Sequence, residues 1–236
     1  MPLRAAAICG LLAPVTFIVG VLLGDLAQPE AFSPAHDDIS DVGAQTADQA
    51  WIYNQIAANL TGLLIIGFAL GLWRALRSGW LARLGVLGLA VIGVTRVVEG
   101  FLRLDCRGID DGCENTSWHA DGHRFESGIA SALFFLVPLQ LAFAFRQLPK
   151  WRDLWLPTLL VVPVVVAVSI PFSLIGDGAA LRAASITWFL WLGLVAWRLL
   201  RIADGKTVSS AADLTPSLQR DDRSRGSRSR NSRRAG

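Results

Sequence analysis

The stretch LWLPTLLVVPVVVAVSIPF, residues Leu154 to Phe172, contains no charged side chain and is about as long as a helix that crosses the hydrocarbon core of a bilayer. Five other apolar runs of similar character are Ala5 to Gly24, Ile56 to Trp73, Leu84 to Val98, Ile129 to Phe145 and Ala183 to Leu200. Of all 236 residues, 53% are hydrophobic and only 17% are charged, whereas soluble domains carry about 25% charged residues. The sequence therefore predicts a polytopic membrane protein.

The backbone of a lipid-exposed segment must satisfy its own hydrogen bonds, and the chain shows no alternating ten-residue pattern of a barrel strand. We therefore predict an all-α fold, a transmembrane bundle of six helices within residues 1–202. The predicted spans are about 5–24, 54–73, 81–100, 125–145, 154–173 and 183–200. A start near Leu81 places Arg96 and Glu99 at the membrane interface, where charged side chains are tolerated.

Basic residues cluster at the N-terminus, in every second connection and after the last span. They are Arg4, Arg74, Arg77, Arg83, Arg146, Lys150, Arg152, Arg198 and Arg201. The first connection instead has six acidic residues and no Lys or Arg, the acidic ones being Asp25, Glu30, Asp37, Asp38, Asp41 and Asp48. The positive-inside rule then predicts that both termini are cytoplasmic.

Residues 203–236 form the last segment, which is rich in Gly, Ser, Asp and Arg and ends in RDDRSRGSRSRNSRRAG. Such a composition buries too little apolar surface to fold, so we predict a disordered cytoplasmic tail. No aromatic residue alternates with the arginines to stack on bases, and we expect no nucleic-acid partner. A basic tail next to a membrane is expected to contact anionic lipid.

Two of the three cysteines, Cys106 and Cys113, share the second predicted outer loop, whereas Cys9 lies in the first span. An oxidising compartment favours a disulfide between the loop pair. The alternative is a zinc site of pattern C-x6-C-x5-H-x3-H that adds His119 and His123. Its spacing is tighter than that of common zinc fingers, and an oxidising compartment disfavours free thiolates.

His119 and His123 stand one helical turn apart, and Ser127 and Ser131 continue the same face if the fourth helix begins near Trp118. Two such imidazoles can chelate one metal ion, for which zinc is the natural candidate. A carboxylate would complete the site, for which the sequence offers Asp105, Asp110, Asp111, Asp121 and Glu126. Asp105 and Ser127 are the candidate catalytic residues. The glutamate of HExxH is missing, and the alternative is a polar helix start whose side chains bond one another.

Further polar residues are expected at the outer end of the bundle, where they would form a polar cap. They are Asn54, Asn59, Arg96, Glu99, Ser40 and Asp41. Ionisable groups within a membrane often mark a binding or transport site. We predict that this cap binds a lipid headgroup or a protein partner.

The segments FSPAHDDISDVGA (residues 32–44) and SWHADGH (residues 117–123), with a loop that bears Asp and Cys between them, resemble the family catalogued as domain of unknown function 998. The resemblance covers roughly Leu11 to Leu200. It implies a six-helix, multi-pass protein of a bacterial plasma membrane and carries no established activity. Ala120 replaces a more usual glycine, and the cysteine-bounded insert around Asp110 is a second departure.

Two functions of different classes follow from these patterns. The first is binding, by the polar cap, of a membrane lipid or of a partner whose identity the sequence does not specify. The alternative is a metal-dependent intramembrane hydrolase acting on a lipid, which resembles alkaline ceramidases in general plan only. A transporter is less favoured because no inverted repeat is visible.

Overall fold

The protein is represented by a computed structural model that describes residues 1–76 and 79–205, and its main compact unit is Met1–Asp204. The helices are α1 (Leu3–Leu26), η1 (Ile39–Gly43), η2 (Ile52–Leu60), α2 (Thr61–Ala75), α3 (Trp80–Glu99), α4 (Trp118–Gln147), η3 (Arg152–Leu154), α5 (Trp155–Ser173) and α6 (Asp177–Ala203). Here η1 and η3 are 3₁₀-helices and η2 is a π-helix. The described residues form no strand, and the predicted all-α fold is confirmed.

Within the described residues, six helical stretches are long and apolar enough to cross a membrane, as predicted. The π-helix η2 continues into α2, and η3 continues into α5. The predicted spans lie within these stretches, apart from Gly100 at the end of the third. Of the predicted tail, Ala203 still belongs to α6, and residues 206–236 lie outside the described part of the chain.

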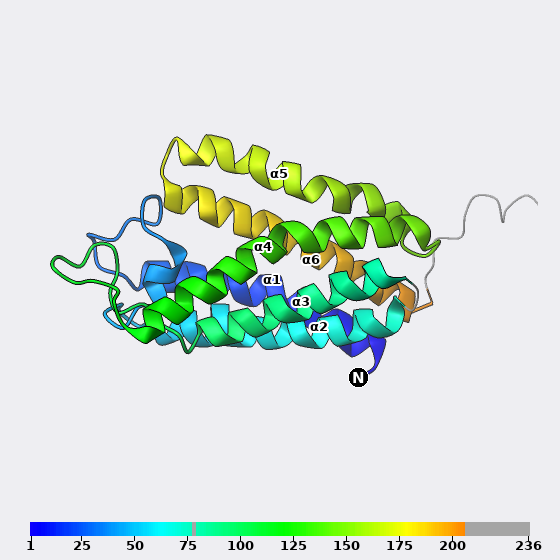
Figure 1. The fold of residues 1–236 in the computed structure, drawn as a ribbon, viewed down its shortest axis with the longest axis horizontal. Coiled ribbons are helices and arrows are strands. Elements are labelled where there is room, and N and C mark those ends of the chain that lie inside the picture. Colours follow the sequence, from blue (N-terminus) through cyan, green and yellow to red (C-terminus); the bar gives the residue numbers. More distant parts are fainter. Residues whose placement is uncertain (77–78, 206–236) are drawn as a thin grey trace, which may run out of the picture. The chain divides into compact units, whose positions relative to one another are not determined.

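The six long helices form a closed ring in sequence order, because each packs against the next and α6 packs back against α1. The contact between α4 and α5 is the smallest of the six. Figure 1 shows that the N-terminal half of α4 diverges from α5, while α5 and α6 stay side by side. The ring is therefore least tightly closed between α4 and α5.

Small residues let the helices approach closely, as is common in membrane bundles. A Cβ atom added to Gly62 of α2 would lie 2.5 Å from the carbonyl oxygen of Gly93 in α3, and one added to Gly20 of α1 would lie 2.6 Å from the nitrogen of Ala57. At these two positions the backbones of α2 and α3, and of α1 and η2, approach too closely for a larger residue.

Aromatic side chains fill the other half of the ring. Trp188 of α6 stacks on Phe134 of α4 with ring centroids 4.2 Å apart, and its indole N–H donates to the carbonyl oxygen of Phe134 over 3.1 Å. Phe189 stacks on Phe17 of α1 at 4.1 Å. The indole of Trp191 donates to the hydroxyl of Thr158 in α5 over 3.1 Å. Helix α6 thereby contacts α1, α4 and α5.

Two long loops, residues 27–51 and 100–117, lie at one end of the bundle (Figure 1, left). The first loop is fixed to α6, since Arg182 donates to the carbonyl oxygen of Asp37 over 2.8 Å, and Arg182 also pairs with Asp25 of α1 at 2.7 Å. At the opposite end, Arg4 lies 3.9 Å from Asp204. Met1 and the end of α6 are therefore at the same end, away from the two loops.

Candidate functional site

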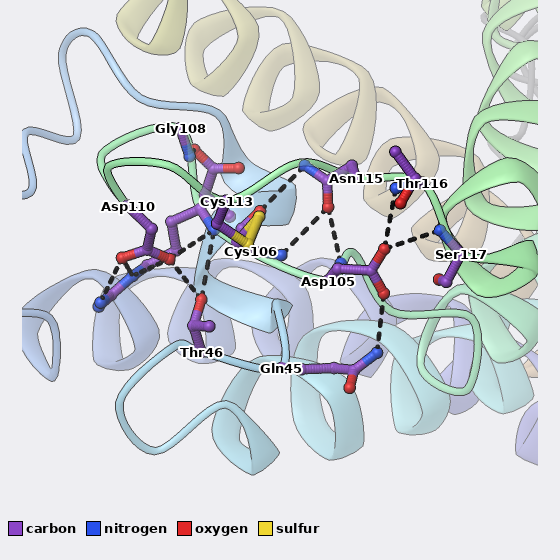
Figure 2. Close-up of a disulfide and its surroundings, with 12 residues drawn as sticks. Gln45, Thr46, Asp105, Cys106, Gly108, Asp110, Cys113, Asn115, Thr116 and Ser117 are labelled. Carbon is purple, nitrogen blue, oxygen red and sulfur yellow. Dashed lines mark hydrogen bonds and ion pairs between the residues drawn. A yellow bond between two sulfur atoms is a disulfide. The ribbon is translucent and has the colours of Figure 1, made fainter.

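Cys106 and Cys113 form a disulfide, as the sequence predicted (Figure 2). The side chain of Asn115 stabilises the ring that the disulfide closes. Its Oδ1 accepts from the backbone N–H of Cys106, and its Nδ2 donates to the carbonyl oxygen of Cys106, each over 3.1 Å. The cysteines are thus bonded to each other and do not join a zinc site.

The second loop is also bonded to the first. Asp110 accepts from Arg107 Nη2 at 2.9 Å and from Thr46 Oγ1 at 2.5 Å (Figure 2). The hydrogen bonds from Arg107 and Thr46 lower the pKa of Asp110 to about 2. Asp41, one of the predicted cap residues, accepts from the N–H of Gly108 over 3.1 Å, while burial raises its pKa. The two loops form one connected layer over the end of the bundle.

Asp105, a predicted catalytic candidate, lies in this layer (Figure 2). Its carboxylate accepts from the N–H groups of Thr116 and Ser117 at 3.0 and 2.9 Å and from Gln45 at 3.2 Å. Hydrogen bonds from the side chain and the N–H of Ser117 lower the pKa of Asp105. These contacts lie immediately before α4, where Ser117 caps the helix by accepting from the N–H of Ala120 over 3.2 Å.

A cavity of about 620 Å³ lies beneath the loop layer and is lined by residues of α1, η2, α3, α4, α5 and α6 and of both loops. Its apolar wall includes Phe134, Phe135, Val161, Val165, Leu181 and Trp188. Its polar wall includes Ser40, Tyr53, Arg96, Glu99, His123, Glu126, Ser127 and Ser185. Three residues that line the cavity, Ser131 and Phe135 of α4 and Leu181 of α6, are also exposed, so the cavity reaches the protein surface at these residues.

One polar cluster of the cavity joins α3 to η2. The hydroxyl of Tyr53 donates to Glu99 Oε1 at 2.5 Å, and Arg96 Nη1 donates to Glu99 Oε2. Arg96 Nη2 donates to the carbonyl oxygen of Ala57 over 3.1 Å, and its guanidinium lies over the ring of Phe17. Both oxygens of the buried Glu99 therefore have partners, as such a group requires.

A second polar cluster lies on α4. Ser127 Oγ donates to Glu126 Oε1 over 3.0 Å, and His123 Nδ1 lies 3.5 Å from the same oxygen. His123 Nδ1 is also 3.1 Å from the carbonyl oxygen of Leu102, which can only accept, so this nitrogen carries the proton. Glu126 is only 5% exposed, yet its Oε2 has no hydrogen-bond partner.

The predicted histidine stripe is divided by the structure. His123, Ser127 and Ser131 line the cavity, whereas His119 is not among its lining residues and stacks on Trp118 with ring centroids 3.7 Å apart. Among the described residues, no three His, Cys, Asp or Glu side chains are grouped so that they could hold a metal ion. A zinc site that includes His119 and His123 stays a prediction of the sequence.

Only some of the predicted polar-cap residues line the cavity. Ser40, Arg96 and Glu99 line the cavity. Asn54 donates to the carbonyl oxygen of Gly43 over 3.0 Å and so fixes the loop, and Asn59 donates to Gln55 over 3.0 Å.

Tyr53 and Trp188 are among the cavity residues that the sequence did not indicate as binding groups. Tyr53 is the only tyrosine of the chain and precedes the asparagines of η2, which was the available sign of a polar cluster. Trp188 lies within an apolar run and gave no such sign.

Comparisons with curated proteins and with solved structures gave no match. The model of one family, described as a protein of unknown function (DUF998), matches residues 11–198. The match includes the second to fifth apolar stretches entirely, most of the first and sixth, and the two loops that cover the cavity. The chain therefore belongs to the DUF998 family, as its resemblance predicted.

Proposed function

We propose that the protein binds a membrane amphiphile, with the headgroup at the polar wall of the cavity and the chain along its apolar wall. The observation that carries this proposal is the composition of the cavity. Buried polar groups from η2, α3 and α4 lie within one space whose other wall is formed by aromatic and aliphatic side chains of α4, α5 and α6. Cavities of this size and mixed lining are typical ligand sites.

The dimensions support a lipid as ligand. The lining residues of α4 run from His123 to Phe135, which corresponds to about 18 Å along the helix axis at 1.5 Å per residue. This is roughly half of the 30 Å hydrocarbon thickness of a bilayer, and thus about the depth of one leaflet. The opening bordered by exposed Ser131, Phe135 and Leu181 gives the ligand a lateral route of entry from that leaflet.

The proposed orientation of the bundle determines the leaflet to which the cavity opens. We place the loop layer outside the cell and both termini in the cytoplasm of a bacterial plasma membrane, because Lys and Arg are concentrated at the other end of the bundle. The ion pair of Arg4 with Asp204, which puts Met1 and the end of α6 at one end, agrees with an even number of crossings. The cavity then opens to the outer leaflet.

The test is to fill the cavity. Ala130 lines it, whereas Ala132 lies on the same helix, is exposed and does not line it. We expect Ala130→Phe to reduce the lipid retained by the detergent-purified protein, measured by native mass spectrometry, while Ala132→Phe retains as much as the unmodified protein. Gel filtration checks that both variants fold. Equal lipid retention by Ala130→Phe and the unmodified protein would contradict the proposal.

The metal-dependent hydrolase remains a prediction of the sequence. Two of its residues, His123 and Ser127, line the cavity, but His119 and Asp105 do not. A protein partner on the loop layer also remains a prediction. Neither alternative has an observation that favours it over binding in the cavity, and the proposed function assigns no role to zinc.

A further inference from the structure

Accessible hydroxyl groups in the cavity indicate which headgroup it accepts, an inference that rests on the proposed function and deepens it. Ser185 of α6 lines the cavity and is only 9% exposed. Its hydroxyl bonds to no described residue, yet it keeps accessible surface. A helical Ser or Thr often bonds to the carbonyl oxygen of the preceding turn, as Thr187 does to Ala183 over 2.8 Å. The hydroxyl of Ser185 is therefore left for a ligand.

Ser131 of α4 lies at the same level of the cavity as Ser185. Phe134 stacks on Trp188, and each serine precedes its aromatic residue by three positions on its own helix. Helices α4 and α6 both begin at the loop end, and three residues correspond to about 4.5 Å along a helix axis. The two serines therefore lie about one turn nearer the loop layer than the stacked rings. The hydroxyl of Ser131 also bonds to no described residue.

His123 adds an acceptor two turns before Ser131 on the same face of α4. Its Nδ1 donates to the carbonyl oxygen of Leu102, so that Nε2 of the neutral imidazole carries a lone pair. Nε2 bonds to no described residue and keeps accessible surface. Ser127 lies between the two, and its oxygen can accept while it donates to Glu126. These groups form a row about 12 Å long at 1.5 Å per residue.

The two basic side chains of the lining already have partners. Arg96 donates to Glu99 and to a backbone carbonyl oxygen of η2. Arg124 pairs with Asp121 and donates to a backbone carbonyl oxygen of the second loop. A phosphate in the cavity would have to displace one of these partners or stay without a counter-charge, and either is costly. Such a mismatch selects against phospholipid headgroups.

We propose that the ligand is an amphiphile with a neutral, hydroxyl-rich headgroup, which donates to His123 Nε2 and exchanges hydrogen bonds with Ser131 and Ser185. A hydroxyl both donates and accepts, so it suits the imidazole and the serines alike. One alcohol group contacts only part of a row about 12 Å long, whereas a sugar carries several hydroxyls. The chemistry is that of a glycolipid headgroup, and a free sugar offers the same groups. The apolar wall with Phe134 and Val165 favours the lipid.

The experiment offers the protein three lipids with identical dioleoyl chains, in equal minor amounts, in phosphatidylcholine nanodiscs. They are glucosyl-dioleoylglycerol, dioleoylglycerol with its single hydroxyl, and phosphatidylglycerol, whose hydroxyls accompany a phosphate. Native mass spectrometry counts the lipids that stay bound. We expect glucosyl-dioleoylglycerol to be retained about tenfold over each of the others, a factor equivalent to about 1.4 kcal/mol. Equal or greater retention of phosphatidylglycerol would overturn the neutral headgroup.

The double variant Ser131→Ala, Ser185→Ala removes two hydroxyls of the cavity without adding bulk, and we expect it to lose most of this preference. The matched control is Ser169→Ala, Ser173→Ala, which removes two hydroxyls of α5 that bond to their own helix and do not line the cavity. Gel filtration checks that both proteins fold. A preference that survives in the first double variant would overturn the assignment to these hydroxyls.

The variant His123→Asn keeps an N–H donor at the position of Nδ1 and removes Nε2, and we expect it to weaken the preference for the glycolipid several-fold. Should this variant fail to fold, the serine variants still decide the matter. Soluble methyl glucoside, equimolar with the glycolipid, distinguishes the two sources of the headgroup. We expect the glycolipid to be retained, and its displacement would assign the site to a free sugar and overturn the lipid as ligand.

Two further negative results differ in what they overturn. Lipid that is retained without preference, and is lost in Ala130→Phe, overturns the hydroxyl-rich headgroup and leaves binding in the cavity intact. Lipid retention that Ala130→Phe does not reduce overturns both proposals.

Discussion

At the scale of single residues, the buried contact between Tyr53 and Glu99 shows how the polar wall is held. The tyrosine hydroxyl donates to Oε1 at 2.5 Å, and both side chains are almost fully buried. Tyr53→Phe keeps the ring and removes the donor, so that the carboxylate loses one partner within the bundle. The expected cost is roughly 1–3 kcal/mol.

Thermal unfolding in detergent measures this cost. For a chain of this size about 1 kcal/mol corresponds to 2–4 °C, so the Tm of Tyr53→Phe should fall by several degrees. Ser173→Ala is the control, since it removes an exposed hydroxyl that bonds only to its own helix. An unchanged Tm for Tyr53→Phe would mean that the contact contributes nothing to stability.

A second residue, Asp110, joins the two loops outside the spans. Its bonds to Arg107 and Thr46 lower its pKa to about 2, from the usual 3.8. For a lowered acid pKa the stabilisation is present above the unfolded-state value and is lost as pH falls through the folded one. We therefore expect the loop contact to persist at pH 5 and above, to weaken below about pH 4 and to be lost near pH 2.

The variant Asp110→Asn imitates protonation at neutral pH and should cost about 1 kcal/mol, as a partly exposed ion pair does. Faster amide hydrogen exchange in peptides covering residues 105–117 would report the opening. The neighbouring exposed carboxylate is the control, and Asp111→Asn should leave exchange unchanged. Equal exchange in the two variants would show that the charge of Asp110 does not hold the loop.

At the scale of elements, the close approach of α2 and α3 depends on glycine. A Cβ atom on Gly62 would lie 2.5 Å from the carbonyl oxygen of Gly93, so Gly62→Ala must push the helices apart. We expect a loss of about 1–3 kcal/mol, the usual cost of overpacking. Gly128 lies within α4 and has nothing within 4 Å, so Gly128→Ala should instead stabilise by about 0.5–1 kcal/mol. Opposite shifts of Tm are the expected result, and shifts of the same sign would contradict it.

The disulfide loop is the second element with a direct test. Arg107 lies inside the ring closed by Cys106 and Cys113, and its guanidinium is bonded to Asp110 and Gln28. Replacing both cysteines by serine removes a constraint worth roughly 2 kcal/mol in the chain-entropy account. Trypsin should then cleave after Arg107 several-fold faster. Cys9→Ser, which removes the free cysteine of α1, should leave the cleavage rate unchanged, and an unchanged rate in the double variant would mean that hydrogen bonds alone hold the loop.

The same elements show what sequence patterns could and could not predict. Apolar runs predicted the spans because the bilayer fixes how much apolar length a helix needs. Hydropathy placed the start of the fourth span at residue 125, whereas the helix itself starts at Trp118, as the histidine stripe had assumed, and Ser117 caps it. The π-helix η2 and the hydrogen bond between Tyr53 and Glu99 depend on how η2 packs against the neighbouring helices, so no local sequence pattern predicts them. The cavity was unpredictable for the same reason, although several of its polar residues had been named.

At the scale of the whole molecule, the orientation decides which leaflet the cavity faces. The loops at the cavity end carry the disulfide, and the opposite end carries most of the basic residues. In a Cys9→Ser background, the only thiols are those of Cys106 and Cys113, which become reactive after reduction. We expect a membrane-impermeant maleimide to label them on intact spheroplasts, and only after a reductant has been added.

The matched control is a chain in which all three cysteines are serine and Gly236→Cys places one thiol at the last residue. It should be labelled only after the spheroplasts are permeabilised, because the positive-inside rule puts this end in the cytoplasm. The reverse pattern would place the loop layer inside the cell. The cavity would then open to the inner leaflet, and its ligand would have to be sought among cytoplasmic-leaflet lipids. The reducing cytoplasm would also no longer favour the disulfide, so labelling of Cys106 and Cys113 would then need no reductant.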